Sequence, residues 1–339
     1  MKRVLQIEDP VRDHIYRSAF EELPWEMYQE IASHLETFDI LRLGLVNHYM
    51  QNIAPALVTK IGRSEWCVGH HTLSRCKNTR SLYNWELGID ASWFHNLSKL
   101  DCFYILLENL VELSRLKTLR CCTSNAWKTT QLTFPSITNL NLLHWGIIPP
   151  NLTRMFYNLE TLTLTGESND QRSMDIVRAQ RSETHRLKHL QFIEGTAEYP
   201  IVDCPHLESL VLFNCVGTFR NMAGYQSLKV LCMYSYDLTY PHMETILEFP
   251  SLDSLCIREA TWLHGKSFPR LQELHCTLIR GCDMGSIVNM MGHLQHIHTA
   301  ICLDQFAPQK VTCNVTVDEC TYSMPTKYCI CGRKLWKHY

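Results

Sequence analysis

Residues 207–215 read LESLVLFNC, in which Leu207, Leu210 and Leu212 have the spacing Leu-x-x-Leu-x-Leu. Ten copies of this apolar spacing follow one another between residues 97 and 299, at steps of 19 to 28 residues with a mean near 22. The copies begin at Leu97, Leu116, Ile137, Leu159, Leu187, Leu207, Leu228, Leu252, Leu271 and Leu294. So regular a series indicates one structural unit repeated along the chain.

Each copy predicts a short strand whose alternate apolar residues point into a shared core, because side chains alternate between the two faces of a strand. A single unit cannot bury these residues alone, so neighbouring units must stack. The motif and its period resemble the leucine-rich repeat. We therefore predict an α/β fold in which residues 81–318 form one curved solenoid with a parallel sheet on its concave face. The framework residues expected to be buried are Leu140, Leu162, Leu210, Leu231 and Leu255.

A different pattern precedes the repeats. Residues 23–53 read LPWEMYQEIASHLETFDILRLGLVNHYMQNI and predict three short helices. Pro24 suits the start of the first helix, and Asp39 is a candidate N-cap of the second. Met27, Ile31 and Leu35 form an apolar stripe at four-residue spacing. So small a unit buries little of its own surface, so another surface must cover it.

This stretch resembles the F-box, whose pattern runs Leu-Pro, an acidic residue, an apolar helix, Asp-Leu-Leu and Leu-x-x-Val-x-x-x-Trp. Tyr49 stands where that family has Trp. The resemblance implies binding to a Skp adaptor through apolar residues that match the adaptor-contacting positions. These are Leu23, Pro24, Ile31, Leu35, Leu41, Val46 and Tyr49. The implied organisation is an N-terminal segment 1–19, an F-box 20–62, a linker 63–80, the repeats 81–318 and a tail 319–339.

An F-box followed by leucine-rich repeats resembles the substrate receptors of SCF-type cullin-RING ubiquitin ligases. The resemblance implies that the adaptor links this chain to cullin and RING subunits while the repeats hold a protein substrate for ubiquitination. The chain would then be no enzyme and need no cofactor. The alternative is a scaffold or structural factor that binds the adaptor without a role in degradation.

Substrate contacts are expected on the concave face, at the strand residues on either side of the second repeat leucine. The candidates are Asn139, Asn141, Thr161, Thr163, His189, Gln191, Val211, Val230, Glu273, His275, His296 and His298. The alternative contact region is the polar insert 166–186, which lengthens one repeat. Insertions in repeat proteins fall on surface arms.

Composition sets limits on the partners. The formal net charge of −2 argues against general electrostatic binding to nucleic acid or to an anionic membrane. Since no apolar stretch reaches the ~20 residues that span a bilayer and no secretory signal is recognisable, we expect a cytoplasmic or nuclear protein. The 16 cysteines then indicate reduced core thiols, as at Cys102, Cys121 and Cys276.

Two cysteine groups are candidate zinc sites. One contains Cys67, His70, His71 and Cys76, and the other contains Cys313, Cys320, Cys329 and Cys331. Neither has the paired Cys-x-x-Cys arms of a typical zinc site, so we expect no metal. The 17 histidines do not form His-Glu-x-x-His, and no nucleophile or phosphate-binding motif occurs.

Overall fold

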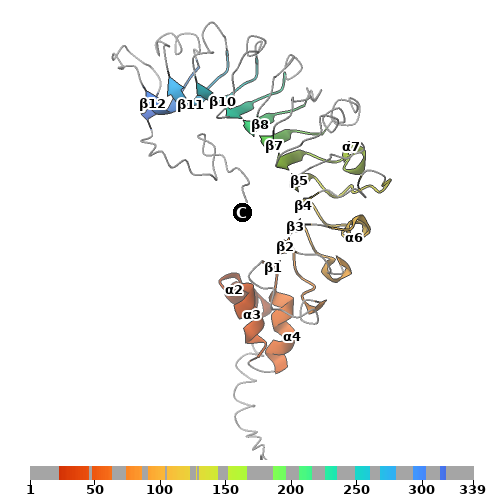
Figure 1. Ribbon diagram of the computed structural model, residues 1–339. Coiled ribbons are helices and arrows are strands. Elements are labelled where there is room, and N and C mark those ends of the chain that lie inside the picture. The colour runs from red at the N-terminus through yellow and green to blue at the C-terminus, as the bar shows by residue number, and fades with distance from the viewer. Residues whose placement is uncertain are drawn as a thin grey trace, which may run out of the picture. The chain divides into compact units, whose positions relative to one another are not determined.

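The structure is a computed structural model with the N-terminal helices and parallel strands drawn in Figure 1. It describes residues 23–45, 48–62, 74–85, 91–103, 105–122, 127, 130–143, 152–165, 186–195, 206–215, 226–234, 249–259, 268–279, 293–302 and 314–317. The chain divides into two compact units, Met1–Thr118 and Leu119–Tyr339.

The first unit opens with three helices, α2 (Trp25–Ser33), α3 (Thr37–Leu43) and α4 (His48–Leu57). The carbonyl of Pro24 accepts the N–H groups of Met27 and Tyr28, which starts α2. The prediction that Asp39 caps α3 is wrong, since Glu36 holds the N-cap position and Asp39 lies in the first turn. A carboxylate in the first turn also stabilises a helix, because it interacts favourably with the helix dipole. An acidic residue near the start of a helix can therefore be mistaken for its N-cap.

A proline inside α4 is compensated by a residue far along the chain. Pro55 has no N–H to donate to the carbonyl of Gln51, four residues earlier. The guanidinium of Arg75 donates to that carbonyl instead, with Nη2 at 2.9 Å, and also contacts Asn52 Oδ1 at 3.2 Å. Arg75 thereby ties the segment after the helices to the middle of α4.

Strands follow the helices in the first unit. The parallel strands β1 (Lys60–Ile61), β2 (Ser81–Trp85) and β3 (Lys99–Cys102) pair in that order. Between them and after them lie η2 (Ala91–Phe94) and α6 (Leu107–Glu112), which pack against each other. The hydroxyl of Thr37 on α3 donates to the carbonyl of Lys60, joining a helix to β1. The core contains Ile40, Met50, Ala54, Leu57 and Ile61.

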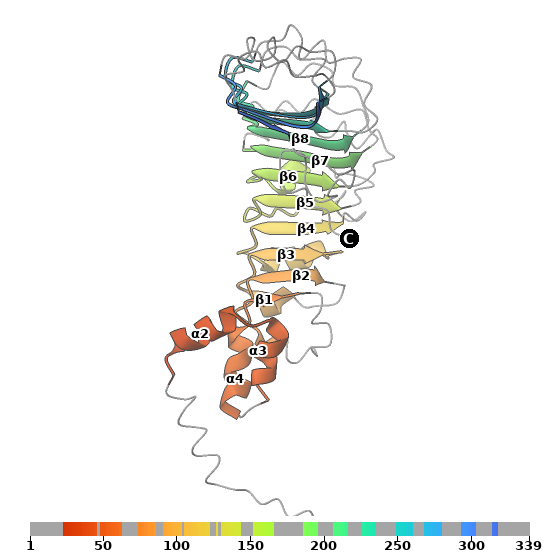
Figure 2. The same cartoon turned by 90° about the vertical axis from the view of Figure 1, so that its left-hand side faces the viewer.

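The second unit is a curved leucine-rich-repeat solenoid with a parallel sheet on its concave face, as the repeats predict. Strand β4 (Thr118–Cys122) starts at the last residue of the first unit. The strands that follow are β5 (Asn139–Leu143), β6 (Thr161–Thr165), β7 (His189–Gly195), β8 (Ser209–Cys215), β9 (Val230–Tyr234), β10 (Ser254–Glu259), β11 (Glu273–Ile279), β12 (His296–Cys302) and β13 (Asn314–Val317), with α7 (Leu152–Met155) between β5 and β6. Figure 1 shows β5 to β12 along an arc, and Figure 2 shows β5 to β8 stacked as parallel rungs.

The repeat leucines form one continuous row across this sheet. From β5 to β13 the register partners are Leu140, Leu162, Leu190, Leu210, Leu231, Leu255, Leu274, Ile297 and Val315. The five framework leucines named from the sequence are all buried, which confirms that prediction. Cys102, Cys121 and Cys276 are also buried, as expected of thiols at leucine positions.

A second series of buried residues, all phenylalanines, precedes the strands of the repeats. Five phenylalanines stand three residues before the first apolar residue of a repeat, and all are almost completely buried: Phe94, Phe134, Phe156, Phe249 and Phe268. In each case that apolar residue donates its N–H to the phenylalanine carbonyl, at 2.9 to 3.3 Å. The Phe134 and Phe156 rings stack at 5.3 Å, and Trp127 lies 5.9 Å from Phe156. The pattern Phe-x-x-Leu is therefore part of the repeat.

Candidate functional site

The N-terminal helices expose apolar side chains that their own core leaves uncovered. On α2, Tyr28 and Ala32 are buried, while Trp25, Met27 and Ile31 remain 40%, 49% and 43% exposed. Phe38 on α3 and Leu45 just after it are exposed as well. Exposed large apolar side chains on short helices are candidates for contact with a partner protein. We call Trp25, Met27, Ile31, Phe38 and Leu45 the apolar helix surface.

The predicted adaptor contacts fall on and beside this surface. Ile31 and Pro24 are exposed, whereas Leu23, Leu35, Leu41 and Tyr49 are half-buried. The Tyr49 ring lies 6.4 Å from the ring of buried Tyr28, so Tyr49 also supports the helix packing. Val46 lies outside the described residues. Whether these residues contact an adaptor stays a prediction.

Sequence reasoning missed three members of the apolar helix surface, namely Trp25, Phe38 and Leu45. Trp25 adjoins the apolar stripe, but only the helix boundary shows that it stays outside the core. The guanidinium of Arg42 lies 4.2 Å from the Phe38 ring centroid and 3.6 Å from Asp39. The Arg42 guanidinium therefore makes a cation–π interaction with one face of the Phe38 ring.

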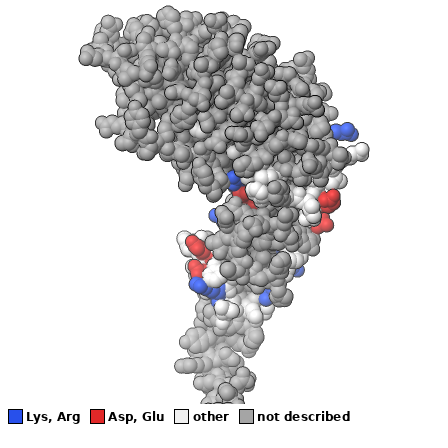
Figure 3. All heavy atoms as spheres, in the orientation of Figure 1, with Lys and Arg blue, Asp and Glu red and all other residues white. Residues whose placement is uncertain are grey.

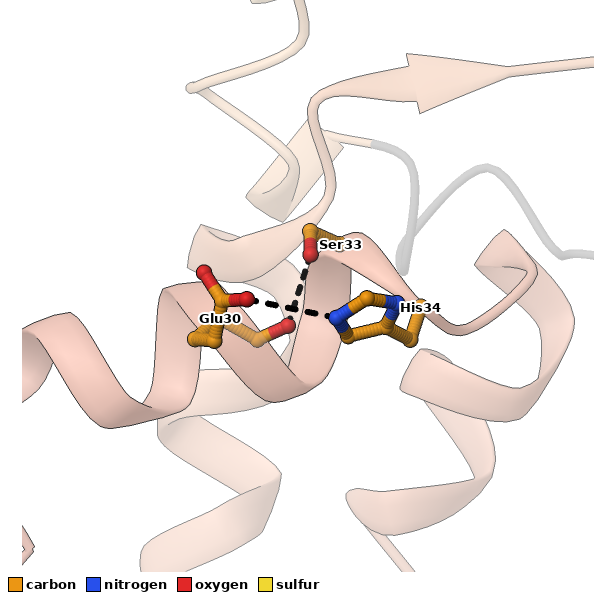
Figure 4. Close-up of polar contacts among 3 residues, drawn as sticks. All are labelled: Glu30, Ser33 and His34. Atoms are coloured by element: carbon orange, nitrogen blue, oxygen red, sulfur yellow. Dashed lines mark hydrogen bonds and ion pairs between the residues drawn. The ribbon is translucent and has the colours of Figure 1, made fainter.

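The C-terminal end of α2 is polar (Figure 4). The Ser33 hydroxyl donates to the carbonyl of Glu30 at 2.7 Å, and His34 Nε2 lies 3.2 Å from Glu30 Oε1. Both Glu30 and His34 side chains are 75% exposed. More widely, Figure 3 shows acidic and basic side chains mixed over the described part of one face, with no field of a single sign. The apolar helix surface therefore has a charged border at this end of α2.

On the sheet, the candidate substrate residues form two rows on either side of the framework leucines. The first row contains the first residue of each strand, and the second row contains the third residue. First-row candidates are accessible: His189 and Glu273 are exposed, and Asn139, Thr161, Val230 and His296 are half-buried. The first row can therefore contact a partner at these positions, whereas its member Ser254 on β10 is buried.

The second row differs from the sequence-based expectation. Asn141 and Gln191 are half-buried, but Thr163, Val211 and His275 are buried. Cys232 and Cys256 of the same row are fully buried. The expectation that these positions are open to a partner is therefore wrong for the buried members. Cys232, Cys256 and His275 have further interactions within the protein.

His275 shows how the two rows interact. Its Nε2 lies 3.7 Å from Glu273 Oε2, so the exposed carboxylate of the first row reaches the buried imidazole of the second. Thr163 and Gln191 are a neighbouring polar pair of the second row, 3.5 Å apart. His298 is the register partner of His275 on β12, but its side chain lies outside the described residues.

The described part of the chain offers no metal site. In the described ranges, no group of three or more His, Cys, Asp or Glu side chains could hold a metal ion. Cys76 is buried and forms no disulfide. Its companions lie outside the described residues, as does the second group: Cys67, His70, His71, Cys313, Cys320, Cys329 and Cys331. The insert 166–186 also lies outside them, except Arg186. No helix in the described part of the chain is long and apolar enough to cross a membrane.

Likeness to known proteins is confined to a weak structural similarity. No protein-family model matches the chain, and no curated protein matches its sequence. Among solved structures, an internalin from Listeria monocytogenes matches with 12% sequence identity and a TM-score of 0.44, over 78% of this chain and 88% of the internalin. Repeat solenoids in general present extended surfaces that bind other proteins.

Proposed function

We propose that this protein is the substrate-recognition subunit of an SCF-type cullin-RING ubiquitin ligase. Its N-terminal helices dock on a Skp adaptor, and its repeats capture a protein for ubiquitination. The observation that carries the proposal is the apolar helix surface, which exposes Trp25, Met27 and Ile31 within the stretch that resembles the F-box. The F-box assignment itself depends on that resemblance.

The physical contribution of such a receptor is proximity. The adaptor-bound helices would fix one end of the chain to the ligase, and the first row of the sheet would hold the substrate. Transfer of ubiquitin then becomes effectively intramolecular, so that a modest affinity for substrate suffices. The receptor needs no catalytic group, and its specificity is set by the side chains of the sheet.

Adaptor docking is tested with purified adaptor and isothermal titration calorimetry. Replacing Leu23 and Pro24 together by Ala should weaken binding by ~10³-fold, because hot-spot truncations typically cost ≥2 kcal/mol each. Met27→Asp with Ile31→Asp should abolish measurable binding, because both side chains are about half exposed and would place carboxylates in an apolar interface. Glu30→Ala is the matched control on the polar border of α2 and should bind as the wild type does.

The same variants separate the two candidate functions. If adaptor affinity is unchanged in both double variants while thermal unfolding is also unchanged, the F-box proposal fails. The wild-type chain could bind adaptor but recover no cullin from cells, with no protein accumulating when the chain is depleted. That result would favour the adaptor-bound scaffold over the ligase receptor. Recovery of cullin together with a stabilised binding partner under proteasome inhibition supports the receptor.

A further inference from the structure

A charged groove of about 660 Å³ runs along the second unit, beside the residues that immediately precede the strands. We call it the strand-entry groove. The charged residues on which its binding properties depend are Glu160, Arg186, Lys188, Glu208, Lys229 and Arg270. It adjoins the accessible first row of the sheet, because Lys188, Glu208 and Lys229 each directly precede a first-row residue. The groove is therefore open to a partner that lies on the sheet.

The backbone holds these side chains at regular intervals. The N–H of Lys188 donates to the carbonyl of Glu160, that of Glu208 to Lys188, and that of Lys229 to Glu208, at 2.8 to 2.9 Å. The same series continues through Asp253 and Gln272. Each step crosses one strand spacing of about 4.8 Å. A ligand in the groove thus meets charges at fixed positions, without a loss of backbone freedom on binding.

The groove carries an excess of positive charge. Its lining contains four Lys or Arg residues and two Glu residues, a formal charge of +2, whereas the whole chain has −2. Glu208 is engaged by Lys229, whose Nζ lies 3.0 Å from its Oε2. Arg186 donates to the neutral side chain of Asn158 at 2.6 Å, so its charge is not balanced by that contact.

Two of the cations are not held in an ion pair within the described residues. Lys188 and Arg270 are exposed, and their side chains make no hydrogen bond or ion pair with the described part of the chain. They precede β7 and β11, so four strand spacings, or ~19 Å, separate them. That distance matches about six residues of an extended peptide.

The alternation of charges limits the kind of anion. Glu160 and Glu208 lie on either side of Lys188 along the backbone series, so a continuous polyanion would meet carboxylates at every second step. A peptide whose acidic residues are spaced apart avoids this repulsion. From Glu160 to Arg270 the groove crosses six strands, or ~24 Å, which an extended segment of about seven residues fills.

We infer that the strand-entry groove binds an extended acidic segment of a protein partner, with one acidic cluster on Arg186 and Lys188 and a second on Arg270. The inference rests on the proposed function only in taking that partner to be the captured protein. Binding itself depends on the second unit, whereas adaptor docking depends on the first, so the two can fail separately.

The test uses the full chain and fluorescence anisotropy. The probe is a fluorescein-labelled peptide of about 12 residues with two Glu-Glu pairs about six residues apart. Its controls are the Gln-substituted peptide and a peptide with all four glutamates in one run. The protein variant is Lys188→Glu with Arg270→Glu. Its matched control is Lys117→Glu with Arg154→Glu, which makes the same change in net charge at exposed sites outside the groove lining.

The groove variant should bind the paired peptide at least ~10-fold more weakly than the wild type does, and the affinity of the control variant should stay within ~2-fold of wild type. Both variants should keep the wild-type adaptor affinity and the wild-type midpoint of thermal unfolding. The Gln peptide should not bind, and the single-run peptide should bind more weakly than the paired one. The inference would be overturned if the two variants lost affinity equally, or if the paired peptide did not saturate the protein at ~1 mM. It would also be overturned if heparin or single-stranded DNA bound more tightly than the peptide.

Discussion

Cys232 on β9 is the register partner of Cys256 on β10, and both side chains are completely buried in the second row of the sheet. Neither cysteine forms a disulfide. They occupy a face of the sheet that the sequence predicts to be open to a partner. The reactivity of these two cysteines therefore measures how well this part of the sheet is covered.

Neither thiol should react in the native protein. Iodoacetamide requires contact with a thiolate, and complete burial prevents that contact. We expect Cys232 and Cys256 to be unmodified after native labelling and fully modified in concentrated guanidinium chloride, as measured by peptide mass spectrometry. Rapid native modification of either cysteine would show that the second row is open.

Replacing a framework leucine should be far more costly than replacing its neighbour. Leu231 is completely buried, so Leu231→Ala should lower the free energy of unfolding by ~2 to 5 kcal/mol through lost contacts and a residual cavity. Val230 precedes it and is half-buried on the opposite side of the strand, so Val230→Ala should cost ~1 kcal/mol or less. Chemical denaturation compares the two, and equal costs would contradict the assigned orientation of β9.

The hydrogen bond from Lys229 holds the pKa of the Glu208 carboxyl below its usual value. Lys229→Met should raise that pKa toward the ordinary value of ~4.3. Because the folded pKa lies below the unfolded one, the pair stabilises the protein above pH ~4.3, and this stabilisation is lost as pH falls through the folded pKa. The gain is small, since the two side chains are 54% and 37% exposed.

Carbon-13 NMR of labelled glutamate follows the Glu208 titration directly. Lys188→Met is the comparison, because Lys188 acts on Glu208 only through its charge and not through a hydrogen bond. It should move the Glu208 pKa less than Lys229→Met does. An equal effect of both substitutions would mean that the hydrogen bond has no special role.

Arg75 and Pro55 should be energetically coupled. In the wild type, Arg75 supplies the donor that Pro55 removes from the carbonyl of Gln51. Arg75→Ala should therefore cost ~0.5 to 1.5 kcal/mol in the wild type and less in a Pro55→Ala background, where residue 55 can donate. A double-mutant cycle with hydrogen exchange of α4 amides measures the coupling, and strict additivity would remove this explanation.

Much of the fold could be predicted because equivalent positions in neighbouring repeats indicate which residues, far apart in sequence, are in contact. Leu210 and Leu231 are far apart in sequence, but their identical places in two repeats predict their pairing, and they are register partners. The phenylalanine series was missed although it is present in the sequence, for example at Phe249 and Phe268. Each phenylalanine stands in the turn before the strand, outside the Leu-x-x-Leu-x-Leu spacing by which the repeat is recognised.

The candidate surfaces were less predictable than the core. A helical period identifies Met27 and Ile31 as apolar neighbours, but it cannot decide whether the core or a partner covers them. Tyr28 is buried beside them, and Trp25 is exposed, which depends on how the helices pack. Likewise, Val211 and Gln191 are equivalent in the repeat but differ in burial, which the repeat pattern alone does not predict.

The unequal burial of the two rows has a consequence for how this protein can evolve. Amino-acid changes at exposed first-row positions such as His189 alter accessible side chains and leave the packed interior unchanged. Changes at second-row positions such as Cys256 disturb packing as well. New binding preferences can therefore arise by drift along the first row while fold stability is kept, and selection should tolerate far more diversity there than two residues further along each strand.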